Sequence, residues 1–432
     1  MVYGDAFLNG GEIIRSDPFS WTVPNYMWGN SYFLYQIIVA FIFNKFGLLF
    51  LGISFGLVAA FAVWILSFRN LNFTKIAFIT LGSIVASTNV AIRPHTLSFF
   101  LFALLLIFLE KELYVKRKHI FLWFLFFALW ANIHRAFVVG LLVFGVFLTL
   151  QFFHKKQYKK VQNSYISICC FIASVLGTLV TPFPISLWKT GVFFDVTTID
   201  NLRSIAEWQP LALVSQTSIF LAISGIVFVY ILGKKHKQLG PVFAIIAAFL
   251  FSLAFVSAAF TFFWAAIFVF IVSRHLDIKI QWQFDFWSRL PIFLSLLAVS
   301  LAFFSNFVTS LLKSYNFEDR LILDGYPVFA LEYLNKKGVS ANLFNSYEWG
   351  GFIDWRYNNF KVFIDGRMAG WRKSDGKSIL GDYLKIVKGN CDVANGYEIE
   401  TVLVKRDADL TCFEDWEIEY QDEIAKILRR AS

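Results

Sequence analysis

Short polar breaks between long apolar runs of this sequence carry arginines, histidines and carboxylates. The breaks read AIRPHTLS, WANIHRAF and NLRSIAEWQP, and one more acidic residue stands in YGDAFLNGG near the N-terminus. A guanidinium is a planar donor fork that matches phosphate oxygens, and a histidine adds a donor near pH 7. A carboxylate beside such a site can act as a general base. The candidate residues for an anion-binding site are Asp5, Arg93, His95, His134, Arg135, Glu207 and Trp208.

Each of these residues also has an ordinary structural interpretation. Arg93 at a helix end can extend to the lipid headgroups, and His134 can bridge neighbouring helices. Glu207 beside Trp208 suits an interfacial anchor, and Asp5 suits an exposed acid or a helix cap. For the set as a whole, these structural interpretations are less convincing than a binding site. Two Arg-His pairs and two acids on one membrane face are what an anionic ligand requires.

The apolar runs that separate these breaks predict a membrane protein. The 432 residues are 57% hydrophobic and 16% charged, against roughly 25% charged in an ordinary soluble domain. Apolar blocks of ~20 residues must be helical in lipid, where every backbone polar group needs an internal partner. We predict an all-α polytopic membrane bundle of about ten transmembrane helices, at residues 48–68, 76–92, 97–110, 120–133, 137–153, 162–182, 217–233, 240–256, 258–272 and 290–311.

Lysine and arginine are distributed unequally among the connections between these spans. Alternate connections, such as KELYVKRK and HKKQYKK, are rich in lysine, and the positive-inside rule assigns them to the cytoplasm. The remaining connections, which carry the candidate residues, are then extracytoplasmic. We interpret the net charge of +9 as this orientation signal and expect no nucleic-acid partner. The predicted location is the inner or plasma membrane.

Three regions follow from this topology. Ser31–Phe43 is apolar but too short to span, so we expect it to lie along the outer face, and we assign residues 1–47 to an extracytoplasmic first loop. Residues 48–311 form the transmembrane bundle. Residues 312–432 are predicted to be an extracytoplasmic α/β domain, because strand-like pieces (LILDG, ANLFNS, KVFIDG, ETVLV, WEIEY) alternate with helix-like ones (PVFALEYLNKK, SILGDYLKIVK). The sequence leaves open whether Cys391 and Cys412 of this domain form a disulfide.

The segment NSYEWGGFIDWRYNNFKVFIDGR of this domain has two interpretations. Its Gly-Gly pair permits close packing, and Asp365 with the following glycine suits a turn. In the alternative, Trp349, Trp355, Asp365 and Arg367 contact a glycan, with aromatic faces against sugar rings.

Taken in order, these motifs resemble those of the GT-C superfamily of integral-membrane glycosyltransferases. The similarity rests on YGDAFLNGGEIIRSD, RPHTLS, LWANIHRAFVVG, TPFPISLW, IAEWQP and the C-terminal NSYEWGGFIDWR…KVFIDGR. It is strongest to the branch of protein O-mannosyltransferases, lipid A aminoarabinose transferases and rhizobial lipopolysaccharide sugar transferases. The resemblance implies that Asp5 is the catalytic acid of the first loop. It also implies juxtamembrane helices at Ala6–Arg15 and Ser31–Phe43 and a donor site facing Arg93 and His95.

We therefore expect an inverting glycosyltransferase that moves a sugar from a polyprenyl-phosphate donor in the bilayer to an extracytoplasmic glycan, lipid or protein acceptor. Asp5 is the expected general base. Glu207 and Trp208 are expected to contact the acceptor or a metal. The expected phosphate-binding residues are Arg93, His95, His134 and Arg135.

Two features differ from the superfamily pattern. Many relatives carry an acidic pair where this chain has Asp5 alone. We therefore assign no cofactor, and the sequence leaves open whether a divalent cation binds. The pattern also places a membrane helix before the acid, whereas four residues precede Asp5 here. We expect that helix upstream of Met1 or from a partner.

Other function classes stay open. A transporter or flippase for a lipid-linked glycan would place its polar groups near the bilayer midplane on broken helices, whereas here they stand at span ends. A lipid-glycan polymerase or ligase shares the phosphate chemistry. A non-catalytic membrane scaffold is a further class, in which the polar residues of the outer loops would have no binding or catalytic role.

Overall fold

The structure is a computed structural model of the chain. It describes residues 1–67, 73–87, 89, 91–153, 164–189, 192, 205–211, 215–276, 321–338 and 342–430. Two compact units are present: Met1–Arg15 with Trp28–Lys279, and Ser16–Met27 with Ile280–Ser432. We refer to them as the helical unit and the C-terminal unit, and each is described by itself.

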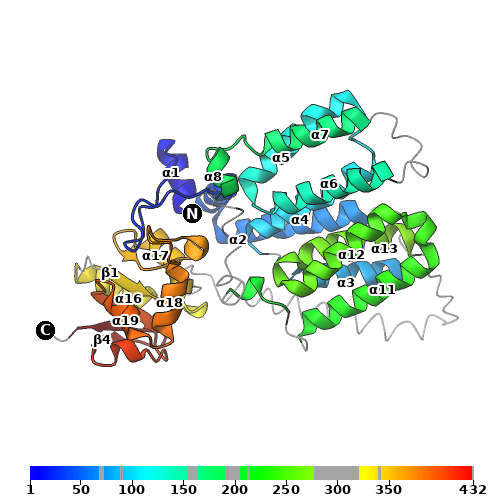
Figure 1. The fold of residues 1–432 in the computed structure, drawn as a ribbon. Coiled ribbons are helices and arrows are strands. Elements are labelled where there is room, and N and C mark those ends of the chain that lie inside the picture. The colour runs from blue at the N-terminus through cyan, green and yellow to red at the C-terminus, as the bar shows by residue number, and fades with distance from the viewer. Residues whose placement is uncertain are drawn as a thin grey trace. The chain divides into compact units, whose positions relative to one another are not determined.

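Apolar helices build the helical unit (Figure 1). A helix occupies every predicted range from 48–68 to 258–272, whereas the range 290–311 lies outside the described residues. Within the described ranges, three helical segments are long and apolar enough to cross a membrane: Phe33–Ser67, Thr217–Leu239 and Ala258–His275. The helices of the unit are α1 (Val2–Gly10), α2 (Phe33–Ser67), α3 (Phe73–Ser87), α4 (Pro94–Glu110), α5 (Ile120–Ile133), α6 (Phe137–Phe153), α7 (Ser164–Gly177), α8 (Pro184–Trp188), α11 (Gln216–Leu239), α12 (Pro241–Val256) and α13 (Thr261–His275).

Helix α13 forms the centre of this unit. It is buried on all sides from Thr261 to Ser273, which is typical of a helix that is apolar all round. It packs against α3, α4, α11 and α12. At its C-terminal end, Arg274 forms an ion pair with Glu110 of α4, with 2.7 Å between Nη2 and Oε2. The central helix thereby fixes the position of α4, which carries His95.

The first loop begins with a helix whose bounds differ from the prediction. We expected Ala6–Arg15, but α1 spans Val2–Gly10. The helix ends because Gly11 adopts a left-handed conformation, with φ 68°, and its N–H bonds back to the carbonyl of Phe7. The predicted helix at Ser31–Phe43 is found as the first part of α2, which a kink at Gly47 separates from the part that follows.

A five-stranded sheet forms the core of the C-terminal unit, in the order β2-β1-β3-β5-β4 (Figure 1). The neighbours β2-β1 and β1-β3 are parallel, whereas β3-β5 and β5-β4 are antiparallel. The strands are β1 (Asn342–Asn345), β2 (Lys361–Val362), β3 (Thr401–Lys405), β4 (Glu417–Gln421) and β5 (Ala425–Arg429). The helices are α16 (Val328–Lys336), α17 (Gly350–Arg356), α18 (Ile379–Val387) and α19 (Cys391–Asn395).

The predicted α/β character of this unit is therefore found, with one error. LILDG is helical at residues 321–323 and then turns, and the N–H of Gly325 bonds to the carbonyl of Ile322. A residue pattern this short does not distinguish a strand from a helical turn. Cys391 and Cys412 are joined by a disulfide.

Residues 16–27 of the first loop fold with the C-terminal unit and form what we call the docking loop. Its ends meet in a bridge between Ser16 and Met27, as in a compact Ω-loop. Its middle extends the sheet beside β2, since the N–H of Val362 bonds to the carbonyl of Phe19 and that of Trp21 to the carbonyl of Val362. The docking loop thus acts as an added edge strand.

Candidate functional site

Three connections between helices of the helical unit bring the predicted polar residues together. Arg93 is the extended N-cap of α4, and Pro94 occupies the first helical position, where its missing N–H costs nothing. His95 follows in the first turn. His134 is the extended C-cap of α5, and its ring centroid lies 4.5 Å from that of His95. The end of one helix and the start of another therefore place the two histidines in contact.

The third connection contains the short helix η4 (Ala206–Trp208), which is held beside the start of α13. The hydroxyl of Ser257 donates to the carbonyl of Glu207 at 2.9 Å, and the N–H of Ala258 donates to the carbonyl of Gln209 at 3.1 Å. These backbone contacts fix the Glu207 position without using its carboxylate.

A cavity of about 130 Å³ lies among these three connections, and we call it the histidine cavity. Its polar lining is His95, His134, Arg135, Glu207 and Trp208, and its apolar lining includes Val138, Phe260, Phe262 and Phe263. Five of the predicted site residues therefore share one cavity. Arg93 joins them through its ion pair with Glu207.

Charged side chains of both signs lie around this cavity. Arg93 Nη1 lies 3.5 Å from Glu207 Oε2, and the two side chains are 59% and 30% exposed. The guanidinium of Arg135 lies 5.4 Å from the ring centroid of Trp208. Two arginines and one carboxylate of the described residues therefore lie at this cavity, and of these side chains Arg93 and Glu207 form an ion pair.

His95 also leaves a polar atom unsatisfied. Its Nδ1 is buried and has no hydrogen-bond partner among the described residues. A buried unsatisfied polar atom costs about 1–3 kcal/mol, and such atoms in folded proteins usually await a water or a ligand. His134, in contrast, uses its Nδ1 in a hydrogen bond of 2.8 Å with the hydroxyl of Ser98.

Asp5 does not line the histidine cavity. Its carboxylate accepts a hydrogen bond of 2.7 Å from the side chain of Asn44, in the first part of α2. That helix meets the site region at its other end, where the hydroxyl of Tyr35 donates to the carbonyl of Ile92 at 2.8 Å. Tyr35 and Asn44 are nine positions apart on this helix, a rise of about 14 Å. The structure therefore does not bring Asp5 to the other predicted site residues.

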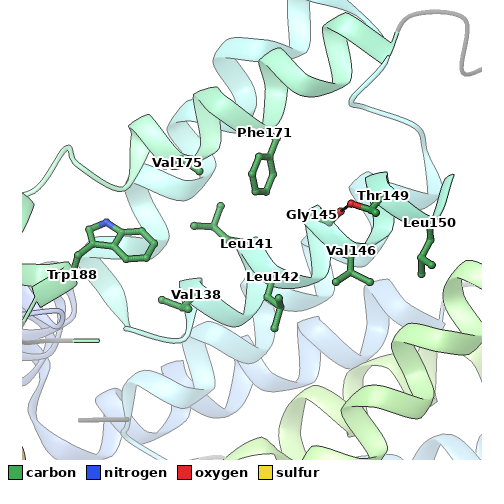
Figure 2. A pocket seen from close by; sticks show the side chains of 10 residues that line it. All are labelled: Val138, Leu141, Leu142, Gly145, Val146, Thr149, Leu150, Phe171, Val175 and Trp188. Atoms are coloured by element: carbon green, nitrogen blue, oxygen red, sulfur yellow. Dashed lines mark hydrogen bonds between the residues drawn. The ribbon is translucent and has the colours of Figure 1, made fainter. Parts of the chain in front are cut away.

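An apolar groove of about 530 Å³ lies along α6, between it and α7 (Figure 2). Val138 lines both this groove and the histidine cavity. The hydroxyl of Thr149 donates to the carbonyl of Gly145 at 2.8 Å, so it presents no free donor to the groove. The lining is Val138, Leu141, Leu142, Gly145, Val146, Thr149, Leu150, Phe171, Val175 and Trp188.

The residues proposed for glycan contact lie in the C-terminal unit and are mostly buried. Trp349 is 2% exposed, and its indole N–H bonds to the carbonyl of Gly325 at 3.1 Å. Asp365 is 1% exposed and accepts the backbone N–H of Arg367 at 2.7 Å, as in an Asx-turn. A Cβ on Gly350 would lie 2.2 Å from the carbonyl oxygen of Ile364. These contacts favour the packing and turn interpretation over glycan contact.

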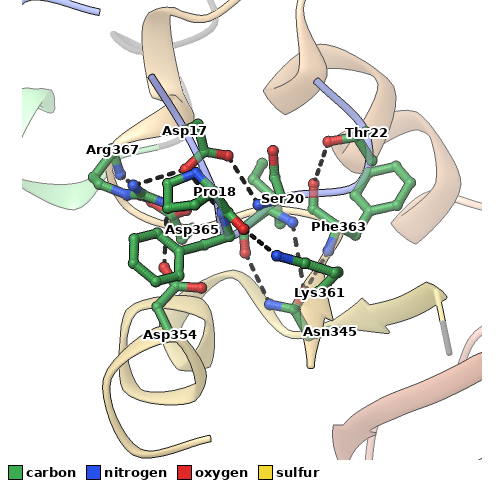
Figure 3. Close-up of polar contacts among 12 residues, drawn as sticks. Asp17, Pro18, Ser20, Thr22, Asn345, Asp354, Lys361, Phe363, Asp365 and Arg367 are labelled. Atoms are coloured by element: carbon green, nitrogen blue, oxygen red, sulfur yellow. Dashed lines mark hydrogen bonds and ion pairs between the residues drawn. The ribbon is translucent and has the colours of Figure 1, made fainter. Parts of the chain in front are cut away.

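Arg367 is the centre of what we call the aspartate-arginine cluster (Figure 3). Its Nη1 lies 2.9 Å from Asp17 of the docking loop, and its Nη2 lies 3.2 Å from Asp354 and 2.5 Å from Asp365. All three carboxylates are buried. Burial and the neighbouring charge of Asp365 raise the pKa of Asp354 well above its ordinary value. This shift favours the neutral form of the Asp354 carboxyl group.

No protein-family model matches this sequence, and no curated protein is significantly similar to it. Across the described part of the chain, no group of three or more His, Cys, Asp or Glu side chains is arranged to hold a metal ion.

Ser98 and Tyr32 both contact His134, and neither residue was predicted to belong to the site. Ser98 stands three residues after His95, a spacing that places two side chains on one helix face. That spacing was a usable signal for Ser98. Tyr32 precedes α2, and nothing in its sequence context indicated the contact.

Proposed function

We propose that this protein is a membrane glycosyltransferase that moves a sugar from a polyprenyl-phosphate donor to an extracytoplasmic glycan, lipid or protein acceptor. One observation carries the proposal. A basic, largely buried cavity adjoins an apolar groove through a shared lining residue, Val138. A polar anionic head joined to a hydrocarbon chain is the ligand class that this pairing fits. The resemblance to the GT-C superfamily supports the same assignment.

The cavity suits the phosphate of the donor. Its volume of about 130 Å³ is below the roughly 300–1,000 Å³ that encloses a drug-sized ligand, so it fits the phosphate but not the whole donor. Arg135 supplies fixed positive charge, and His95 and His134 supply ring nitrogens. In a site with little water, such groups stabilise charge that develops on a leaving phosphate.

The groove suits the hydrocarbon chain. Its lining on α6 runs from Val138 to Leu150, a helical rise of about 18 Å. Because the lining side chains are almost all apolar, a prenyl chain would lose no hydrogen bonds on entering it. A soluble nucleotide-sugar donor would gain nothing from such a groove, which favours a lipid-linked donor.

The reaction requires one base. The acceptor hydroxyl attacks the anomeric carbon, the bond from that carbon to the phosphate oxygen breaks, and the phosphate leaves with the electron pair. The proton of the hydroxyl passes to a carboxylate. The family resemblance implies Asp5 for this role, whereas the geometry favours Glu207, which lines the cavity.

We also propose that the C-terminal unit and the histidine cavity face the extracytoplasmic side of the inner or plasma membrane. The distribution of lysine and arginine among the connections supports this orientation. So does the disulfide between Cys391 and Cys412, because disulfides persist in oxidising compartments. Intact cells that express Ser374→Cys should react with a membrane-impermeant maleimide, whereas Lys237→Cys should react only after lysis. The reverse pattern would contradict the orientation.

Binding of polyprenyl phosphate to the full-length protein in nanodiscs tests the site. Arg135→Ala should weaken binding about tenfold or more, since a charge-assisted contact contributes about 1.5–3 kcal/mol. Arg117→Ala, in the turn between α4 and α5, is the matched control and should leave affinity unchanged. Equal affinities in wild type and Arg135→Ala would contradict the phosphate site.

The base is tested separately by sugar transfer from a panel of polyprenyl-phosphate sugars. We expect Glu207→Gln to reduce the transfer rate about 100-fold or more, which is the usual size of a general-base contribution. Asp5→Asn should have the smaller effect. If Asp5→Asn abolishes transfer and Glu207→Gln does not, the base is Asp5, as the resemblance implies.

A further inference from the structure

Three buried side chains form a hydrogen-bonded chain that ends at the histidine cavity. The indole Nε1 of Trp130 donates to the hydroxyl of Ser98 at 2.9 Å. The same hydroxyl lies 2.8 Å from Nδ1 of His134. Trp130 and Ser98 are fully buried, and His134 is 3% exposed. No solvent competes for these bonds, so the donors and acceptors must satisfy one another.

The direction of each bond follows from the chemistry of the groups. An indole N–H can only donate, so the hydroxyl oxygen of Ser98 accepts from Trp130. The hydroxyl has a single hydrogen, and its other partner among the described residues is His134 Nδ1. If Nδ1 carried a hydrogen, the Ser98 hydroxyl hydrogen would be buried without an acceptor, which is costly. The satisfied arrangement is therefore Trp130 to Ser98 to His134.

We infer that Ser98 and Trp130 are positioning residues that hold His134 as the neutral tautomer with its hydrogen on Nε2. Nδ1 accepts from Ser98, so Nε2 is the ring nitrogen that His134 can offer to the cavity it lines. Trp130 is itself held by its neighbours on α5, with its ring centroid 5.8 Å from that of Phe127 in a stacked arrangement.

This assignment gives His134 a defined task. A neutral imidazole with a fixed Nε2–H is a hydrogen-bond donor that does not depend on protonation of the ring. In the histidine cavity His134 would donate to a phosphate oxygen of the donor lipid, and this donor role rests on the proposed function. The assignment of the tautomer does not depend on the proposed function.

Nitrogen-15 NMR of histidine-labelled full-length protein in nanodiscs tests the tautomer directly. The resonances of His134 are assigned by their loss in His134→Gln. In wild type we expect Nε2 to be protonated and Nδ1 to be unprotonated. A protonated Nδ1 in wild type would overturn the inference, and this measurement needs no variant of Ser98 to fold.

Variants then separate positioning from packing. Ser98→Ala and Trp130→Phe should each give a mixture of the two tautomers, whereas Ser98→Thr, which keeps the hydroxyl, should retain the wild-type spectrum. Ser167→Ala is the matched control, because Ser167 is also a buried helical serine and its hydroxyl has no hydrogen-bond partner, histidine included, among the described residues. An unchanged His134 spectrum in Ser98→Ala would overturn the role of Ser98.

Binding of polyprenyl phosphate separates this inference from the proposed function. Ser98→Ala should weaken binding about tenfold, and Ser98→Thr should restore it. If wild type shows the Nε2–H tautomer but does not bind polyprenyl phosphate, the proposed function fails and the tautomer assignment stands. If Ser98→Ala mixes the tautomers but binds as tightly as wild type, the donor role of His134 is contradicted.

Discussion

The histidine cavity and the aspartate-arginine cluster both gather ionisable side chains from distant parts of the sequence, but they use them differently. In the cluster, Arg367 lies within 3.2 Å of each of three buried carboxylates. In the cavity, one carboxylate lies 3.5 Å from one of two arginines, and both members of that pair are partly exposed.

This difference separates a structural site from a candidate binding site. Each carboxylate of the cluster is paired with Arg367, although Asp354 Oδ1 is buried without a hydrogen-bond partner among the described residues. The histidine cavity encloses a space of about 130 Å³, and Nδ1 of His95 is buried there without a hydrogen-bond partner among the described residues. The two sites are distinguished by the three ion pairs inside the cluster and by the open space inside the cavity.

The comparison predicts its largest effect at the centre of the cluster. Arg367→Met should destabilise the C-terminal unit by about 3–5 kcal/mol, because three buried carboxylates would lose their cation. Pulse proteolysis of the full-length protein in urea measures this change. Arg372→Met, whose guanidinium bonds to the exposed carbonyl of Gly376, is the control. A loss below about 1 kcal/mol for Arg367→Met would show that the cluster is not structural.

A smaller, local effect is expected at the docking loop. Asp17→Asn removes the charge that faces Arg367 but keeps an oxygen for the N–H of Ser20, which now bonds to Asp17 at 2.8 Å. A hydrogen bond to a charged group contributes about 1.5–3 kcal/mol, and two acids still face Arg367. Hydrogen-deuterium exchange of residues 16–27 should therefore accelerate by about ten- to a hundredfold. Glu12→Gln, outside the loop, should leave this exchange unchanged.

A pH-dependent effect is expected at Asp354. Because its pKa is raised in the folded state, the native state binds a proton more tightly than the unfolded state. Its contribution to stability is fully present below the unfolded pKa of about 3.8 and is lost as pH rises through the raised value. Asp354→Asn cannot titrate, so its melting temperature should rise relative to wild type as the pH rises above about 4. A difference that does not change with pH would contradict the raised pKa of Asp354.

The smallest stability effect is expected at the histidine cavity. Arg93→Ala should change the free energy of unfolding by less than about 1 kcal/mol, because its ion pair with Glu207 is partly exposed. The same variant should weaken binding of polyprenyl phosphate. A loss of stability as large as that of Arg367→Met would erase the distinction between the two regions.

Local patterns explain what could be predicted from the sequence. Long apolar runs predicted helix positions because each helix draws its signal from its own residues. The grouping of His95 and His134 followed from their places at neighbouring helix ends. Four of the five strand-like pieces lie in strands for the same reason, and LILDG failed because so short a piece carries too little pattern.

Contacts between distant residues could not be predicted. Asp17 and Arg367 are 350 positions apart in the sequence, and nothing in either segment indicates the other. The interpretation of Asp5 as a member of the site came from motif order, which does not specify how far α1 lies along α2. The burial of Trp349 depends on the carbonyl of Gly325, a partner that no pattern around the tryptophan contains.

The docking loop also constrains how often the chain crosses the bilayer. Residues 16–27 form one folded unit with residues 342–430, so both must lie on the same side of a hydrocarbon layer ~30 Å thick. The chain that joins them must then cross that layer an even number of times. The ten predicted spans satisfy this parity, whereas nine or eleven would not. The contacts of the docking loop with β2 and Arg367 are thus a test of the membrane topology that the sequence predicts.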